Sequence, residues 1–368
     1  MEQQDHLIEV RDLKTYFYLR EGTVKAVDGA NFNILRGKTT GVVGESGCGK
    51  SVTAQSIMQI VPKPGRIVSG DITLWPGGYA PPSPPIPATG SGQALGGAGA
   101  KHPPESGSKR GLPIKITNLD PQGDEMRSLR GSAMGMIFQE PMSSFSPVHT
   151  IGDQLSETIL LHQPVSKDAA KGMVLEMMRH VGIANPERNF AAYPHQLSGG
   201  MRQRAMIAMA LMLRPSLLIA DEPTTALDVT TEAQILRLMR GLQAELGMAI
   251  MFITHDLGVI AEMADDVVVM YLGRVVEYAE VDAIFHDPKH PYLRALLRSI
   301  PRIGVKSGKR LTAIEGMVPN PLDMPAGCPF HPRCPDFMPG LCDVQIPQDA
   351  ALGARHTAAC HLYEREGA

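Results

Sequence analysis

The chain has 368 residues, of which 43% are hydrophobic and 20% are charged, so it can bury a sizeable core and is too long for one small domain. Its formal net charge of −3 disfavours a dedicated nucleic-acid binder. No apolar run approaches the roughly 18 residues needed to span a bilayer, and the polar start of the chain has no secretory signal, so we expect a cytosolic protein whose membrane spans, if it works with any, belong to other chains.

The first elements in chain order are strands followed by a glycine-rich loop. Residues 7–10 and 32–34 alternate apolar and polar side chains, which is typical of strands. Residues 39–43 form a short, partly β-branched run that predicts a buried strand, and residues 51–58 predict the opening of a helix. Between these two, residues 44–51 have the sequence GESGCGKS and match the phosphate-binding pattern G-x-x-x-x-G-K-[ST] at every fixed position.

This loop predicts a nucleoside triphosphate site. Its glycines let backbone N–H groups point inward at an anion, and the helix N-terminus adds partial positive charge. Lys50 would reach the β- and γ-phosphates, and the Ser51 hydroxyl would hold Mg²⁺. The alternative, a glycine-rich turn that binds nothing, is disfavoured by the correct order of strand, loop and helix. The predicted nucleotide-binding residues of the loop are Gly44, Ser46, Gly47, Cys48, Gly49, Lys50, Ser51 and Val52.

The stretch from residue 76 to residue 113 differs sharply from its surroundings. Pro, Gly, Ser and Ala dominate it. Such a composition cannot bury enough apolar surface to offset the entropy lost on ordering. We therefore interpret it as a partly extended, poorly ordered surface insertion, with a proline-rich partner-docking segment as the alternative.

Helical and strand-like patterns alternate after the insertion, which indicates an α/β fold with a parallel core sheet. Helices are predicted over residues 151–161, 167–181 and 199–213. Continuous apolar runs typical of buried parallel strands occupy residues 217–220, 249–253 and 266–270.

The character of the chain changes again near residue 285. Beyond it proline becomes frequent, and four of the five cysteines lie between residues 328 and 360. We therefore predict a nucleotide-binding domain over residues 1–285 and a smaller C-terminal domain over residues 286–368.

Two carboxylates, Asp221 and Glu222, follow the predicted buried strand at residues 217–220. Ligands of open α/β sheets bind at the carboxyl ends of strands. Asp221 is therefore placed to bind Mg²⁺, and Glu222 to polarise the attacking water as a general base. Adjacent acids that are solvated by chance are the alternative, which loses weight once a phosphate loop is present.

A second strong motif, LSGGMRQR, occupies residues 197–204. Two glycines precede a predicted helix, so another helix N-terminus with close backbone access is available to an anion. A simple helix cap would account for Ser198 alone, but not for the two glycines followed by Met-Arg-Gln-Arg.

Over roughly residues 5–285 these motifs, in this order, resemble the ATP-binding subunits of ABC transporters. The resemblance implies a P-loop NTPase of the ABC ATPase type, with a parallel core sheet with helices, an antiparallel β subdomain and a helical subdomain. Phe17, or its neighbour Tyr16, resembles the aromatic that stacks on adenine. Gln139 resembles the Q-loop glutamine and His255 the switch histidine, which would act in catalysis beside Glu222. The Mg²⁺ ligands implied are Ser51, Gln139 and Asp221.

The same resemblance assigns a role to the motif at residues 197–201, which is similar to the family's signature, and to residues 226–228, which are similar to its D-loop. In this family two ATPase domains meet head to tail. Ser198 and Gly200 would therefore contact nucleotide held by the partner, and Asp228 is assigned to the nucleotide site with them.

Residues 50–52, residues 198–211 and the His-Pro-Tyr at residues 290–292 resemble the "D" ATPase of dipeptide and oligopeptide importers. Some members import nickel or oligosaccharides instead. The implied partners are a related "F" ATPase, two membrane permease subunits and an extracytoplasmic solute-binding protein, with this chain peripheral on the cytoplasmic face of the cell membrane. The alternatives are a soluble ABC ATPase acting in translation or DNA repair, which the single cassette and acidic charge disfavour, and a nucleotide kinase, which would lack the Leu-Ser-Gly-Gly motif.

The C-terminal cysteines form a further candidate site. Cys328, Cys334, Cys342 and Cys360 are separated by five, seven and seventeen residues. In a cytosolic protein such a cluster favours a metal site over disulfides, and four thiolates suit zinc or an iron–sulfur cluster. The spacing resembles the tail that holds a 4Fe–4S cluster in some dipeptide-importer ATPases. We therefore expect a 4Fe–4S cluster here, with zinc or free thiols as alternatives.

Overall fold

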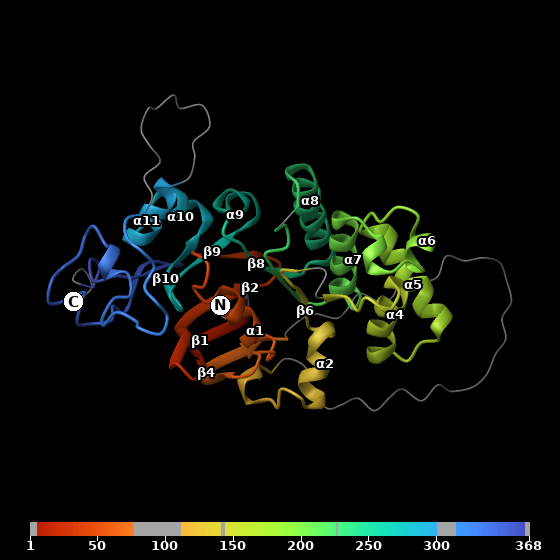
Figure 1. Ribbon diagram of the computed structural model, residues 1–368, viewed down its shortest axis with the longest axis horizontal. Helices are drawn as coiled ribbons and strands as arrows, with labels where there is room; N and C mark the ends of the chain where they lie inside the picture. Colours follow the sequence, from red (N-terminus) through yellow and green to blue (C-terminus); the bar gives the residue numbers. More distant parts are fainter. Residues whose placement is uncertain (1–5, 77–111, 141–143, 226, 300–313, 365–368) are drawn as a thin grey trace, which may run out of the picture.

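The computed structural model describes residues 6–76, 112–140, 144–225, 227–299 and 314–364. The predicted insertion over residues 76–113 therefore lies almost entirely outside the described residues, as does residue 226 of the predicted D-loop. Figure 1 shows the described part as a central sheet region with a helical group at one end and the C-terminal segment at the other.

Among the described residues of the first third of the chain, four strands form an antiparallel sheet. Their spatial order is β2 (Thr23–Leu35), β1 (His6–Tyr18), β4 (Gly65–Leu74) and β5 (Ile114–Lys115). β1 and β2 are longer than the alternating stretches at residues 7–10 and 32–34. Register shifts such as that between Val10 and Leu13 interrupt the alternation, so the sequence pattern shows only part of each strand. Leu74 of β4 lies opposite Ile114 of β5, so the segments that flank the insertion are side by side.

In the part of the chain that the structure describes, eight strands form the second sheet, which runs through the centre of the molecule (Figure 1). Neighbours from β9 to β6 are parallel, whereas β10, β12 and β11 continue the sheet in antiparallel pairing. The predicted parallel core sheet is therefore confirmed. The spatial order is β11 (Asp349–Gly353), β12 (His356–Ala359), β10 (Arg274–Glu280), β9 (Asp266–Tyr271), β3 (Thr39–Val43), β8 (Ala249–Ile253), β7 (Leu217–Asp221) and β6 (Met134–Ile137).

The predicted helices are present with bounds that differ by at most two residues. They are α1 (Lys50–Ile57), α4 (Ile151–His162), α5 (Lys167–His180) and α7 (Gly199–Leu211). The sequence-based prediction omitted α8 (Val229–Leu246), although its buried residues Ile235, Leu236, Met239 and Leu242 recur at helical spacing. The others are α2 (Asp124–Ser132), α6 (Pro186–Phe190), α9 (Leu257–Met263), α10 (Val281–His286) and α11 (Pro291–Arg298). Within the described ranges, no helix combines the length and apolarity that crossing a membrane requires.

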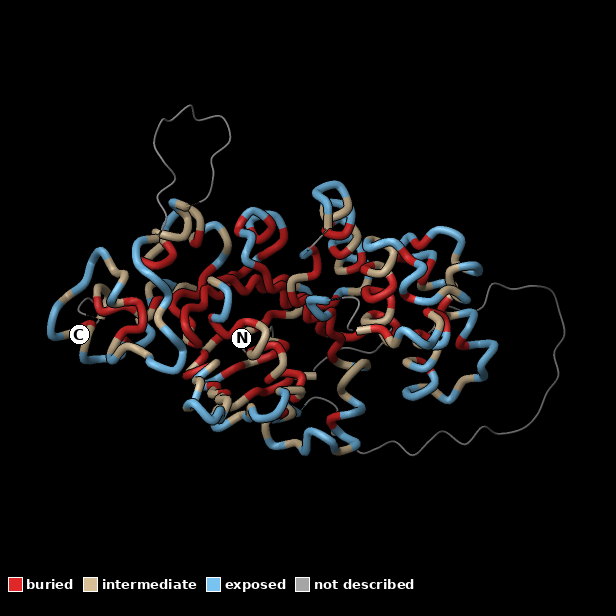
Figure 2. The backbone as a smooth tube through the Cα atoms, in the orientation of Figure 1, coloured by how far each residue is buried: buried red, intermediate tan, exposed pale blue. Residues whose placement is uncertain are grey.

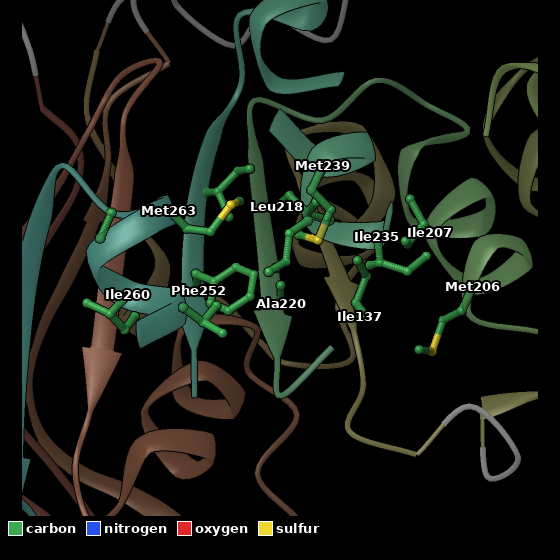
Figure 3. Packing of buried hydrophobic residues seen from close by; sticks show 14 of the residues in the cluster. Ile137, Met206, Ile207, Leu218, Ala220, Ile235, Met239, Phe252, Ile260 and Met263 are labelled. Atoms are coloured by element: carbon green, nitrogen blue, oxygen red, sulfur yellow. The ribbon is translucent and has the colours of Figure 1, made fainter. Parts of the chain in front are cut away.

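The central strands are buried along their whole length (Figure 2). Because both faces of these strands are covered, they appear in the sequence as continuous apolar runs. Successive side chains of β7 point to opposite faces of the sheet. Leu218 and Ala220 pack in one core cluster, which Figure 3 shows together with Ile235 and Met239 of α8. Leu217 of the same strand packs in the other cluster, which extends under the antiparallel sheet.

The C-terminal segment is joined to the central sheet by strand pairing. β12 pairs with β10, where Ala358 lies opposite Glu277, and β11 pairs with β12 at the sheet edge. Glu277 is 1% exposed and accepts hydrogen bonds from the backbone N–H groups of Lys289 and His290. The backbone of residues 286–368 thus continues the core sheet in its described part instead of forming a sheet of its own.

Candidate active site

The phosphate loop lies between β3 and α1, enclosed by two neighbouring backbones. Gly49 has φ +100°, and a Cβ there would lie 2.2 Å from the carbonyl oxygen of Ala26. A Cβ on Gly44 would lie 2.2 Å from the carbonyl oxygen of Met270. Only glycine fits at either position, so the loop sequence and its close packing explain each other.

Lys50 points into the loop. Its Nζ donates hydrogen bonds to the carbonyl oxygens of Gly44 at 2.8 Å and Glu45 at 3.2 Å, and the residue is only 6% exposed. Cys48 is buried beneath it, and burial raises the pKa of the Cys48 thiol. Ser46 and Gly47 form the exposed tip of the loop. The loop therefore holds a buried positive charge behind a tip that is open to solvent.

Two predicted Mg²⁺ ligands meet, although 170 residues separate them in the chain. The Ser51 hydroxyl at the start of α1 donates a hydrogen bond to Oδ1 of Asp221 at 3.0 Å. Asp221 ends β7 and is 4% exposed, and burial raises the pKa of its carboxyl. A hydroxyl and a carboxylate side by side are hard oxygen donors of the kind Mg²⁺ prefers.

Glu222 is the point where the predicted catalytic residues converge. Gln139 Nε2 donates to its Oε2 at 3.0 Å, and His255 Nδ1 lies 3.3 Å from its Oε1. The three residues follow β6, β7 and β8. These strands are parallel neighbours, so their carboxyl ends lie at the same end of the sheet. Thr225 Oγ1 also donates to Oε2 at 3.0 Å, and the sequence analysis did not assign this residue.

The surroundings of Glu222 keep its carboxylate ionised. Burial alone would raise its pKa, but the hydrogen bonds from His255 and Thr225 outweigh burial and lower the pKa below its ordinary value. Its backbone has φ +46°, in the left-handed region that side chains other than glycine rarely adopt. An ionised, oriented carboxylate beside Asp221 can accept a proton from water.

Ser198 and Asp228 lie at the N-termini of other helices. Ser198 caps α7 by accepting the backbone N–H of Met201 at 3.3 Å, and Asp228 caps α8 by accepting that of Thr231 at 3.0 Å. Both residues are exposed. A Cβ on Gly200 would lie 2.9 Å from Cγ2 of Thr231, so the two helix starts are packed together. The signature-like motif and the D-loop-like segment thus form one exposed group.

The two aromatic candidates of β1 have different surroundings. Gly65 makes room for the Phe17 ring, since a Cβ there would lie 2.6 Å from Phe17 Cε1. The Tyr16 hydroxyl donates to Asp28 at 2.6 Å, and burial together with this hydrogen bond raises the pKa of Tyr16. The Tyr16 hydroxyl is therefore already bound to a carboxylate, and Phe17 remains the better candidate for stacking on adenine.

Comparison with known proteins identifies the family. The model described as "ABC transporter" matches residues 27–87 and 98–225, and that described as "Oligopeptide/dipeptide transporter, C-terminal region" matches residues 276–342. The chain belongs to the ABC transporter family of ATP-binding proteins. It is therefore an ABC ATPase, as the sequence motifs predict.

Relatives of this ABC ATPase match it over nearly its whole length. It is 46% identical to a probable peptide ABC transporter ATP-binding protein of Sinorhizobium fredii, over 97% of this chain and 95% of the relative. It is 43% identical to the oligopeptide transport ATP-binding protein AppD of Bacillus subtilis, over 98% of each chain. The structure of cbiO1 from Clostridium perfringens, part of the ABC transporter complex cbiONQ, has a TM-score of 0.56 at 25% identity, over 77% of this chain and 92% of that one. These matches confirm the family and the ABC ATPase fold, and they do not support the soluble alternative.

Of the four C-terminal cysteines of the ABC ATPase, Cys334 is half-buried and the other three are buried. Burial raises the pKa of Cys334 to about 12 and that of Cys360 to about 11, and the neighbouring Cys328 adds to both shifts. The backbone N–H of Cys328 also donates to the carbonyl oxygen of Cys342 at 2.8 Å. Four thiols are a suitable donor set, but among the described side chains no three His, Cys, Asp or Glu residues are close enough to form a metal site. The expected cluster is therefore not supported by the geometry.

Proposed function

We propose that this ABC ATPase hydrolyses ATP with Glu222 as the general base. The observation that carries the proposal is the convergence of Gln139, Thr225 and His255 on this one ionised carboxylate. In this role Glu222 takes the proton of the attacking water while His255 and Gln139 orient the carboxylate and the water.

The neighbouring residues would hold the nucleotide. Lys50 and the loop from Gly44 to Val52 bind the phosphates, and the adenine stacks on Phe17. Ser51, Asp221 and Gln139 would hold Mg²⁺, which supplies charge to neutralise the transferring phosphoryl group. The hydrogen bond between Ser51 and Asp221 supports this assignment, because it places two of the three proposed oxygen ligands side by side.

The exposed group formed by Ser198, Gly200 and Asp228 is proposed to act in a second subunit's site. These residues start two helices, so their backbone N–H groups can meet phosphate across a dimer interface. Each subunit would thus complete the nucleotide site of its partner. We propose a related "F"-type ATPase as that partner, because the chain resembles the "D" member of such pairs.

The cargo is proposed to be a peptide. Both relatives described above carry peptide or oligopeptide transport in their names, and the C-terminal match is to the oligopeptide and dipeptide transporter region. The ATPase would then sit peripherally on the cytoplasmic face of the membrane, with two permease subunits and an extracytoplasmic solute-binding protein. Nickel and oligosaccharides are the alternative cargoes.

For the four cysteines we propose an iron–sulfur cluster, with zinc as the alternative, although the described side chains do not have metal-binding geometry, so ligation would have to draw the four thiols together. The proposal rests on the shared burial of Cys328, Cys334, Cys342 and Cys360 and on the softness of four sulfur donors. Its role would be structural, since it would cross-link a segment with little core of its own.

Uptake measurements test the assignment as a whole. Cells whose genomic copy carries Lys50→Ala should lose uptake of isotopically labelled di- and oligopeptides and keep uptake of the free amino acids. Glu245→Gln, an exposed carboxylate that pairs with His180 in the helical region, is the matched control and should leave peptide uptake unchanged. Normal peptide uptake in the Lys50→Ala strain, with lost uptake of nickel or oligosaccharide, would reassign the cargo.

A further inference from the structure

The second residue of the phosphate loop, Glu45, is held by the C-terminal part of the chain. Arg333 Nη1 donates to Glu45 Oε2 at 2.8 Å, and Nη2 donates to Oε1 at 3.1 Å. The backbone N–H of Glu45 donates to the Tyr292 hydroxyl at 3.0 Å. These partners are 288 and 247 residues away in the chain. Both the side chain and the backbone of Glu45 therefore depend on tertiary packing.

The Arg333 guanidinium is fixed on every side. Nη1 also donates to the Tyr271 hydroxyl at 3.2 Å, and Nε donates to the carbonyl oxygen of Glu315 at 3.2 Å. The side chain is 4% exposed, whereas that of Glu45 is 25% exposed. The guanidinium carbon lies 5.9 Å from the centroid of the Tyr271 ring, and the rings of Tyr271, Tyr292 and Phe330 pack against one another with centroid separations from 4.7 to 5.4 Å. Because the Arg333 side chain is shielded from solvent, water cannot solvate its charge. Arg333 therefore needs the Glu45 carboxylate as its counter-charge.

The pair formed by Glu45 and Arg333 affects the charge around the phosphate loop. The carbonyl oxygen of Glu45 lies 3.2 Å from Lys50 Nζ, so Glu45 is part of the wall around the buried ammonium. An uncompensated carboxylate at this position would repel the phosphates of a nucleotide. The bidentate contact with Arg333 neutralises the carboxylate and keeps it turned toward the C-terminal segment.

We propose that Arg333 is a positioning residue of the phosphate loop, through which the C-terminal segment sets the affinity of this ATPase for nucleotide. The inference rests on nucleotide binding at residues 44–52, as proposed above. It assigns the C-terminal segment an influence on the site without any contact to the nucleotide. Because coupling is reciprocal, bound nucleotide stabilises the docked position of residues 314–364 by the same factor.

A second arginine of the same segment provides a matched control. Arg355, in the turn between β11 and β12, pairs with Asp266 at 3.2 Å and with Glu280. It therefore also ties the C-terminal segment to the main domain, but at the start of β9, whereas the phosphate loop follows the opposite end of the parallel strand β3. Arg355→Met weakens the attachment alone, whereas Arg333→Met weakens it and also frees the Glu45 carboxylate.

The test measures the dissociation constant of MgATP for the full-length chain by titration with a fluorescent ATP analogue, and kcat by phosphate release. Arg333→Met should raise the dissociation constant at least about tenfold, the usual effect of losing a charge-assisted hydrogen bond, while kcat at saturating ATP stays within about threefold. Arg355→Met should change neither by more than about twofold. Adding Glu45→Gln to Arg333→Met should restore affinity to within about threefold of the parent, because the freed charge is removed.

The outcomes separate the possible roles. Affinity unchanged in Arg333→Met overturns the inference. Lost affinity that Glu45→Gln does not restore also overturns it, because the loss then comes from undocking of the segment. If Arg333→Met does not fold, Arg333→Gln carries the test, since it removes the charge but keeps a hydrogen-bonding group beside the Glu45 carboxylate. A dissociation constant within about 1.5-fold of the parent in this variant would overturn the inference. Failure of the parent chain itself to bind MgATP would instead contradict the proposed nucleotide site.

Discussion

Glu222→Gln tests the catalytic centre most directly. Glutamine has the shape of glutamate, but it carries no charge and its amide cannot take a proton from water. Glu222 accepts hydrogen bonds from Gln139 and Thr225 on Oε2 and faces His255 on Oε1. The substitution therefore keeps one accepting oxygen in place and removes the base. The hydrogen bond from Lys50 to the carbonyl oxygen of Gly44 and that from Ser51 to Asp221 do not involve Glu222. Both should persist.

General base catalysis contributes about 10²- to 10⁴-fold to a rate, which corresponds to about 3–5 kcal/mol of activation free energy. We expect Glu222→Gln to lower the steady-state rate of phosphate release by a factor in this range. The dissociation constant of MgATP should change by less than about threefold, because the phosphate and Mg²⁺ contacts remain. Mixed with the proposed partner ATPase, the variant should also accumulate as an ATP-bound dimer, visible as an earlier peak in size-exclusion chromatography with ATP.

The matched control is Glu245→Gln, the same chemical change at an exposed ion pair with His180. Surface pairs of this kind are worth about 0–1 kcal/mol, so its turnover should equal that of the parent. A Glu222→Gln protein that hydrolyses ATP within about threefold of the parent would refute the reasoning. The carboxylate would then only orient its neighbours, and another group would accept the proton.

The remaining predictions concern the phosphate loop, the insertion and the cysteines. Lys50→Ala should weaken MgATP binding itself, because the proposed contact of Lys50 with the phosphates forms before as well as during reaction; unchanged affinity in a titration would contradict the assignment. Replacing residues 76–113 by a short turn should leave ATPase activity within about twofold, since Leu74 and Ile114 already lie opposite each other, and a collapsed melting transition would show that the insertion is structural. Protein purified without oxygen should be brown and should lose iron when any one of Cys328, Cys334, Cys342 or Cys360 is replaced by serine, whereas colourless protein with stoichiometric zinc would reverse the choice of metal.

Local sequence determined the parts of the site that a single segment can build. Residues 44–51 contain the glycines, the lysine and the serine in fixed order, between the wholly buried strand β3 and the helix α1. The central strands were equally readable, since a strand buried on both faces must be apolar throughout. The helical spacing of Ile235, Leu236, Met239 and Leu242 in the long helix α8 was equally readable, but the prediction omitted this helix.

Tertiary structure alone decided which distant residues meet. Gln139, Glu222 and His255 each follow a separate strand, and only the parallel order of β6, β7 and β8 brings their side chains to one edge. No local pattern gave Arg333 as the partner of Glu45, because an arginine 288 residues away is an ordinary polar residue until packing buries it. The four cysteines show the opposite case, in which a suggestive spacing did not by itself produce metal-binding geometry. Spacing along the chain fixes local conformation, whereas distances between segments depend on how the whole core packs.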